Sequence, residues 1–109
     1  STWDKQWMQI TANNLTMNNC VFDATTLRFY TNYSSLLKLN ATNLRVMNCE
    51  IKIADSIPPC KYAFSSNGEN VTGDVYYIYN IIPGWISLGR MPTNANFVAY
   101  GNIFGNADS

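Results

Sequence analysis

Two ten-residue stretches of this chain repeat each other. The first, at 14–23, reads Asn-Leu-Thr-Met-Asn-Asn-Cys-Val-Phe-Asp, and the second, at 43–52, reads Asn-Leu-Arg-Val-Met-Asn-Cys-Glu-Ile-Lys. When position 14 is aligned with position 43, four positions are identical, and they hold Asn, Leu, Asn and Cys. The positions that differ most lie between the apolar ones, so the repeat keeps an apolar pattern.

This pattern predicts two short strands joined by a bend. Leu15 and Met17 point to one side of a first strand, and Cys20 and Phe22 point to the same side of a second. The phase break between them falls at two asparagines, which tolerate the left-handed backbone of a sharp bend. The bend turns the chain around a core, and its repetition stacks the second stretch about 4.8 Å from the first.

A fainter echo extends the pattern along the chain. Residues 96–104 resemble 14–22, with Phe97 and Phe104 in matching positions. The interval from 43 to 96 is nearly twice the interval from 14 to 43, which predicts two further turns of the stack. The intervening turn should begin near Asn70. Further strand-like runs lie at 27–30, 36–39, 75–82 and 85–88.

The composition favours strands and excludes several kinds of function. Asparagine, serine and threonine are abundant, and these suit turns between strands better than helix surfaces. The absence of His removes Ser-His-Asp and Cys-His nucleophile systems. Seven basic and seven acidic residues cancel, so we expect no nucleic-acid partner. No apolar run reaches the roughly 20 residues of a membrane span, so we expect no membrane insertion.

The chain is long enough for one domain. We expect residues 14–109 to form the stacked turns and C-terminal strands, preceded by an N-terminal arm or linker at 1–13. Within that arm, Thr2–Met8 is the candidate for a short helix, because Trp3 and Trp7 are spaced by one helical turn.

The cysteines number three, Cys20, Cys49 and Cys60, with no Cys-x-x-Cys pair, so no metal site is expected. Cys20 and Cys49 occupy the same position one turn apart, where stacked side chains rarely reach disulfide geometry. We expect all three thiols to be reduced and Cys60, after two prolines, to be exposed.

The repeated Asn-Leu-x-Met-x-Asn-Cys-x-Phe stretches resemble coils of a right-handed parallel β-helix, the solenoid of pectate-lyase-like proteins and bacteriophage tailspikes. The expected fold is therefore all-β, a solenoid of about three to four coils. An antiparallel β-sandwich is the alternative that short strands and frequent turns would also fit. The resemblance implies a trimer or a piece of a longer spike, located in the virion (the phage tail) or extracellularly once assembled.

The segment 75–82 also favours association. Read as one strand, it is apolar on both faces, and such a strand is normally buried on both. A neighbouring protomer would cover the second face, and the tailspikes that this sequence resembles are homotrimers.

Aromatic residues are the candidates for ligand binding. Sugars bind flat rings together with amide and carboxylate edges, and the chain is rich in both. We assign Trp85, Tyr76 and Tyr79 as candidate glycan-binding residues, with bacterial surface polysaccharide as the partner. Burial in the core or in a trimer interface is the competing interpretation of these rings.

Two classes of function remain open. The first is a non-enzymatic part of a phage tailspike or fibre that contributes host-surface attachment and trimer stabilisation. The second is a polysaccharide-degrading hydrolase or lyase on the same solenoid, for which Glu50 and Asp55 are the candidate acidic pair. We favour the first, because the carboxylates are scattered and no acidic metal cluster is visible. No catalytic residue, metal or cofactor is assigned.

Overall fold

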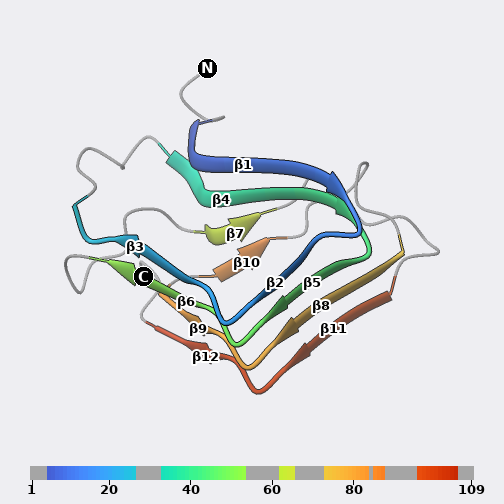
Figure 1. The fold of residues 1–109 in the computed structure, drawn as a ribbon. Helices are drawn as coiled ribbons and strands as arrows, with labels where there is room; N and C mark the ends of the chain where they lie inside the picture. Colours follow the sequence, from blue (N-terminus) through green and yellow to red (C-terminus); the bar gives the residue numbers. More distant parts are fainter. Residues whose placement is uncertain are drawn as a thin grey trace.

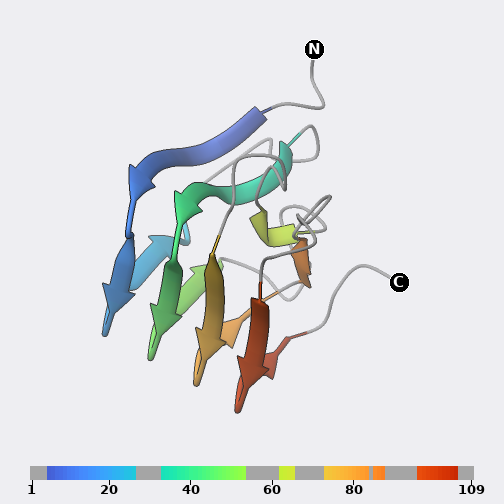
Figure 2. The ribbon, with the colours of Figure 1, turned by 90° about the vertical axis from the view of Figure 1, so that its right-hand side faces the viewer.

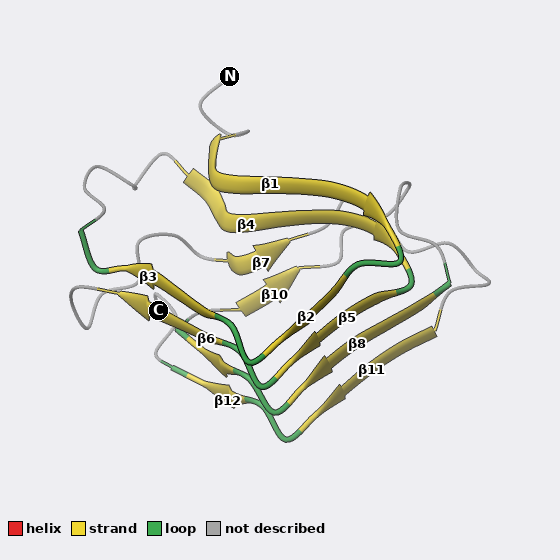
Figure 3. Ribbon diagram, in the orientation of Figure 1, coloured by secondary structure: helices red, strands yellow, loops and turns green. Residues whose placement is uncertain are grey.

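The computed structural model describes residues 5–26, 33–53, 62–65, 73–83, 85–87 and 96–105. These parts of the chain consist of strands and short bends, and they contain no helix (Figure 3). The strands form three four-stranded sheets in which every pairing is parallel. The prediction of an all-β chain is confirmed for these residues, and the antiparallel sandwich is wrong.

Each sheet takes every third strand of the chain. The first sheet has the order β1 (Lys5–Asn13), β4 (Tyr33–Thr42), β7 (Tyr62–Ser65) and β10 (Trp85–Ser87). The second has the order β11 (Asn96–Tyr100), β8 (Asp74–Ile78), β5 (Leu44–Met47) and β2 (Thr16–Asn18). The third has the order β12 (Ile103–Phe104), β9 (Ile81–Ile82), β6 (Glu50–Ile53) and β3 (Val21–Ala24).

The chain therefore passes through the three sheets four times, and we call each pass a circuit. Figure 1 shows the second and third sheets meeting at a V-shaped bend, with the first sheet across the opening. Figure 2 shows the successive circuits lying side by side. The space between the three sheets holds the core.

The two repeated stretches of the sequence pair with each other, residue by residue, in the first two circuits. Met17 pairs with Val46 in the second sheet, and Phe22 pairs with Ile51 in the third. Both partners on the second circuit are buried, as the alternation of apolar residues requires. The predicted stacking of these two stretches is confirmed.

The fourth circuit also lies where its echo of the repeat places it. Phe97 pairs with Val75, and Phe104 pairs with Ile82. The expected start of the third circuit near Asn70 is wrong, because the two remaining circuits are unequal. Leu44 pairs with Val75, and Val75 pairs with Phe97. The chain between Val75 and Phe97 is clearly shorter than the chain between Leu44 and Val75.

Left-handed residues make the bend between the second and third sheets. One residue of each circuit has a positive φ there: Asn19 (58°), Asn48 (52°), Tyr79 (55°) and Gly101 (67°). This backbone costs most L-residues roughly 1–2 kcal/mol, and Asn and Gly tolerate it best. The predicted bend at the paired asparagines is confirmed.

A second line of left-handed residues makes the corner between the first and second sheets, at Asn14, Asn43 and Gly73. Asn43 Nδ2 donates to Asn14 Oδ1 over 2.8 Å, and the Asp74 amide donates to Asn43 Oδ1 over 3.2 Å. A Cβ atom at Gly73 would lie 2.1 Å from Asn43 Oδ1, which explains the glycine. The identity of Asn14 and Asn43 in the repeat therefore reflects this corner.

The bend between the second and third sheets corrects the interpretation of 75–82 as one two-faced strand. The chain turns at Tyr79, so the inward phase shifts between β8 and β9. Val75 and Tyr77 are inward and fully buried, and after the bend Ile82 is the inward residue. The argument for a trimer from double-sided burial is therefore lost, and the homotrimer remains a prediction.

The N-terminal segment is a strand where the structure describes it. The helix expected at Thr2–Met8 is wrong from Lys5 onward, because Lys5–Asn13 is β1. β1 pairs in parallel with β4, and Met8 and Ile10 pack against the core. The part of the expected arm from Lys5 is thus an edge strand of the first sheet.

Cys20 and Cys49 are free thiols one circuit apart, as predicted, and Cys60 lies outside the described residues. The Cys49 thiol donates to the Met47 carbonyl over 3.2 Å and lies 3.5 Å from the Met17 carbonyl of the previous circuit. Burial raises the pKa of Cys49, which makes it a small core residue rather than a nucleophile.

We expect Asn48→Val to lower the free energy of unfolding by about 1.5 kcal/mol, because a β-branched residue is strained at a φ of 52°. Asn48→Gly is the matched control and should stay within about 0.5 kcal/mol of the wild type. Urea denaturation followed by circular dichroism measures both. Equal losses in the two variants would show that the Asn48 side chain, which donates to Asn18, matters more than the backbone.

Candidate functional site: an exposed tyrosine pair at the outer bend

Two exposed tyrosines meet at the outer side of the bend between the second and third sheets. Tyr79 is the bend residue of the third circuit, and Tyr100 ends β11 on the fourth. Their rings pack edge to face with centroids 5.3 Å apart and an angle of 75° between the planes. Tyr79 is 54% exposed and Tyr100 is 61% exposed, so the pair presents aromatic surface to solvent.

Backbone and side-chain contacts hold the pair together. The Tyr79 amide donates to the Tyr100 carbonyl over 2.9 Å, continuing the ladder between β8 and β11. A side-chain hydrogen bond with Tyr100 raises the pKa of Tyr79. The Tyr79 hydroxyl is therefore neutral near pH 7, which suits contact with an uncharged ligand.

The absence of a side chain at Gly101 leaves room for the Tyr79 ring. A Cβ atom at Gly101 would lie 2.4 Å from the Cδ1 and Cε1 atoms of Tyr79, so the ring lies directly over the glycine. The positive φ of Gly101 also completes the line of left-handed bend residues. The glycine thus serves both the bend and the aromatic surface.

Apolar residues extend the exposed surface on either side of the pair. Val98 on β11 is 39% exposed, and Ile81 and Ile103, partners in the third sheet, are 47% and 63% exposed. Single exposed apolar residues are ordinary, but a contiguous group marks a surface for interaction.

The structure separates the three predicted glycan-binding residues. Tyr79 is exposed, whereas Tyr76 is half-buried in β8 with the Arg45 guanidinium 5.7 Å from its ring centroid. One face of the Tyr76 ring is therefore occupied. Trp85 begins β10 in the first sheet, and its side chain lies outside the described residues.

Of the candidate acidic pair, the structure describes Glu50 alone. Glu50 is half-buried at the start of β6, where its register partners are Val21 and Ile81. Asp55 lies outside the described residues. Glu50 therefore has two apolar partners on its ladder and no carboxylate.

Asp23 is a carboxylate held by its own turn. The Thr25 amide and hydroxyl both donate to Asp23 Oδ1, the amide over 3.0 Å. These hydrogen bonds, with a smaller contribution from Lys52, hold the pKa of Asp23 below its usual value. Lys52 is the register partner of Asp23 on the second circuit.

Neither a metal site nor a membrane-spanning helix is found among the described residues. No group of three or more His, Cys, Asp or Glu side chains in the described ranges is placed to hold a metal ion. No helix long and apolar enough to cross a membrane occurs in those ranges.

Comparisons with known proteins add no relative to this description. No family model, no curated protein and no solved structure matches the chain. The function is therefore inferred from the residues of the chain and their geometry.

Sequence reasoning missed Tyr100 and Gly101 as members of the site. The signal was present in the echo at 96–104, which places Tyr100 directly before the fourth bend. The sequence did not reveal that the circuits differ in length. Tyr100 lies beside Tyr79 only because few residues separate β8 from β11.

Proposed function

We propose that the chain is a right-handed parallel β-helix of about four coils in a bacteriophage tailspike or tail fibre, and that it binds bacterial surface polysaccharide without cleaving it. Four circuits through three parallel sheets support the solenoid. Parallel strands joined by crossovers are right-handed in nearly all proteins, which supports the handedness. The resemblance of the repeated stretches to tailspike coils supports the setting.

The exposed pair of Tyr79 and Tyr100 carries the proposal. The C–H face of a pyranose packs on an aromatic ring, and its hydroxyls need hydrogen-bonding partners at the rim. The two phenol hydroxyls and the exposed amides of Asn48 and Asn19, which occupy the same bend on earlier circuits, supply such partners. The surface suits a neutral sugar chain running along the bend.

A shallow surface of this kind gives weak binding per copy, because little of the ligand is enclosed. Several copies held together strengthen attachment by raising the effective concentration of the second and third sites. A homotrimer in the virion or at the cell surface is therefore part of the proposal.

We expect Tyr79→Ala and Tyr100→Ala each to weaken glycan binding about tenfold, because each removes one of the two exposed rings. Val21→Ala is the matched control, since Val21 is 58% exposed on the first circuit at the far end of the third sheet. Binding is measured on an array of bacterial lipopolysaccharide O-chains and capsular polysaccharides. Equal affinity of the wild type and all three variants would contradict the assignment of this surface.

The same polysaccharides test the enzymatic alternative. New reducing ends or unsaturated products should not form. Turnover that disappears in Glu50→Gln or Asp55→Asn would overturn the non-enzymatic function. Binding lost in Trp85→Ala and kept in Tyr79→Ala would move the glycan surface to the first sheet.

A further inference from the structure

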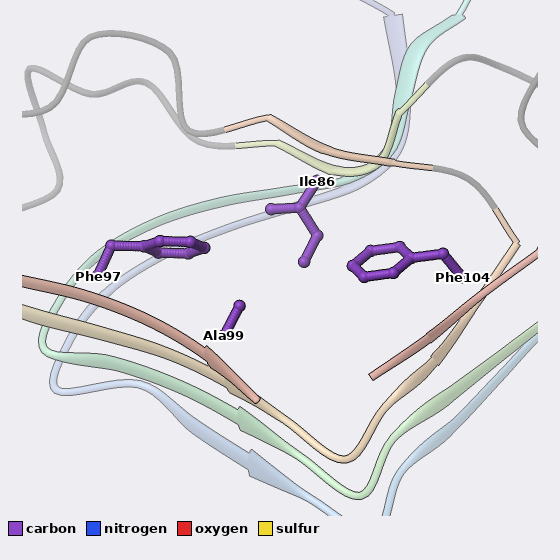
Figure 4. A pocket seen from close by; sticks show the side chains of 4 residues that line it. All are labelled: Ile86, Phe97, Ala99 and Phe104. Carbon is purple, nitrogen blue, oxygen red and sulfur yellow. The ribbon is translucent and has the colours of Figure 1, made fainter. Parts of the chain in front are cut away.

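The fourth circuit leaves the core open. Ile86 of β10, Phe97 and Ala99 of β11 and Phe104 of β12 line an apolar pocket of about 490 Å³. Figure 4 shows these four side chains pointing into a common space between the three sheets. Their apolar character is that of core residues on the earlier circuits.

The inward side chains of the fourth circuit are more exposed than their partners on the third circuit. Phe97 and Phe104 are 43% and 47% exposed, whereas their partners on the third circuit, Val75 and Ile82, are fully buried. These inward positions are therefore covered on the third circuit, which the fourth follows, and partly exposed on the fourth. The surface is shaped as an interface between circuits.

The backbone at this end is also unpaired within the described chain. β10, β11 and β12 are the last strands of their sheets, and β1, β2 and β3 are the last strands at the opposite end. An unpaired parallel edge is a template for a further parallel strand. The two ends offer opposite edges of the same three sheets.

We propose that the open end of the fourth circuit binds the first circuit of a second copy of the chain. β11 and β12 of one copy then pair in parallel with β2 and β3 of the next. This contact continues the interface that already joins the four circuits, with each copy displaced by about 19 Å, or four strand spacings.

The side chains of the two ends match in register. Extending the ladders by one circuit sets Leu15 on Phe97, Met17 on Ala99 and Phe22 on Phe104. These first-circuit residues contribute to the core, and Phe22 is only half-buried. Met17 is already buried in its own copy, with 7% of its surface exposed, and the small Ala99 would lie against it without a clash.

A recurring hydrogen bond fits the same contact. The residue after each bend places a polar side-chain atom beside a carbonyl of the previous circuit. Cys49 Sγ lies 3.5 Å from the Met17 carbonyl, Asn80 Nδ2 donates to Val46 over 2.9 Å and Asn102 Nδ2 donates to Tyr77 over 2.7 Å. Cys20 is the equivalent residue of the first circuit. In a second copy its thiol meets the Ala99 carbonyl.

The contact joins unlike surfaces, so it does not close on itself and repeats along one axis. The zero net charge of the chain leaves no long-range repulsion between copies. We expect sedimentation velocity of the wild type to show elongated oligomers that grow with concentration between about 1 and 200 μM.

Two neighbouring substitutions separate this contact from lateral association. Phe104→Lys places a charge in the pocket and should abolish the growth of the oligomers with concentration. Ile103→Lys is the matched control, because Ile103 is adjacent in β12 but 63% exposed on the outer face, and it should assemble like the wild type. Circular dichroism verifies that both variants keep the wild-type fold.

A mixing experiment gives the sharpest test. Phe22→Lys blocks the first circuit and leaves the pocket intact, whereas Phe104→Lys does the reverse. Each variant alone should show no growth with concentration, and an equimolar mixture should form one-to-one pairs of the two variants and nothing larger.

Three results would overturn the proposal. The first is a wild-type protein whose size does not change with concentration. The second is growth with concentration that Phe104→Lys leaves intact and Ile103→Lys abolishes, which would indicate lateral association through the outer surface. The third is a mixture of folded blocked variants in which no pairing occurs. Glycan binding by a single copy is independent of all three, because Tyr79 and Tyr100 are not among the residues that line the pocket.

Discussion

We expect Phe64→Ala to lower the free energy of unfolding by about 4 kcal/mol, because truncating a buried Phe leaves a cavity that the surrounding structure fills only partly. Phe64 in β7 is 1% exposed. Its register partners in the first sheet are Leu37 and Ile86, and its ring centroid lies 5.4 Å from that of Tyr77 across the core. The substitution therefore removes contacts to three circuits at once.

Phe104→Ala is the matched control for this prediction. Phe104 points to the same interior but is 47% exposed, so its truncation in the monomer should cost less than about 1.5 kcal/mol. Urea denaturation at low protein concentration measures both variants, with the slope of the transition compared to detect changes in the unfolded state. Similar losses for the two residues would mean that Phe64 is not at the centre of the core.

We expect Asn80→Leu to lower the free energy of unfolding by about 3 kcal/mol, although the change keeps the branching of the side chain and adds an apolar residue. Asn80 is 1% exposed. Its Oδ1 accepts from the Cys49 amide over 2.9 Å, and its Nδ2 donates to the Val46 carbonyl over 2.9 Å and to Asn102 Oδ1 over 3.0 Å. Leucine leaves these buried groups without their partner, at about 1–3 kcal/mol for each.

Asn96→Leu is the control for the loss of a side-chain amide. Asn96 is exposed and donates to Asp74 Oδ1 over 3.0 Å, so its replacement should change the free energy of unfolding by less than about 0.5 kcal/mol. Hydrogen exchange adds a local readout, since the Cys49 amide should exchange faster in Asn80→Leu. Unchanged stability in Asn80→Leu would show that water or a rearranged backbone satisfies these groups.

The sequence predicts the first two circuits well because every level of their pattern agrees. The apolar residues alternate along each strand, the phase break falls on asparagines, and identical residues recur at one offset. Leu15 and Leu44 fix the register by themselves, because a slip of one residue would turn the whole strand outward. The placement of Cys20 and Cys49 as unbridged neighbours follows from the same register.

The third circuit could not be located from the sequence for a definite reason. Its bend residue is Tyr79, and nothing in a tyrosine signals a left-handed backbone as Asn48 does on the second circuit. Without the bend, 75–82 resembles one long strand, and an equal division of the remaining chain places the circuit at Asn70. The packing of Tyr79 over Gly101 explains how the structure holds the tyrosine there.

The candidate site was only partly predictable for the same reason. Exposure of Tyr79 depends on the bend, and its pairing with Tyr100 depends on the register of the following circuit. The position of the Arg45 guanidinium over the Tyr76 ring also depends on register, since the two residues are partners on successive circuits. The helix expected near Trp7 failed because local spacing says nothing of the distant strand that pairs with β1.

The difference in length between the circuits has little effect on how the chain folds. Loops of comparable length close when Met17 pairs with Val46, when Leu44 pairs with Val75 and when Val75 pairs with Phe97. Closure entropy varies slowly with length, and the longest and shortest of these loops differ by only about 0.3 kcal/mol. Connectivity thus gives no circuit a kinetic advantage, whereas burial favours the second and third, whose inward residues are covered on both sides. Nucleation at these two circuits and growth toward both ends follow, and the outermost strands are the first to fray.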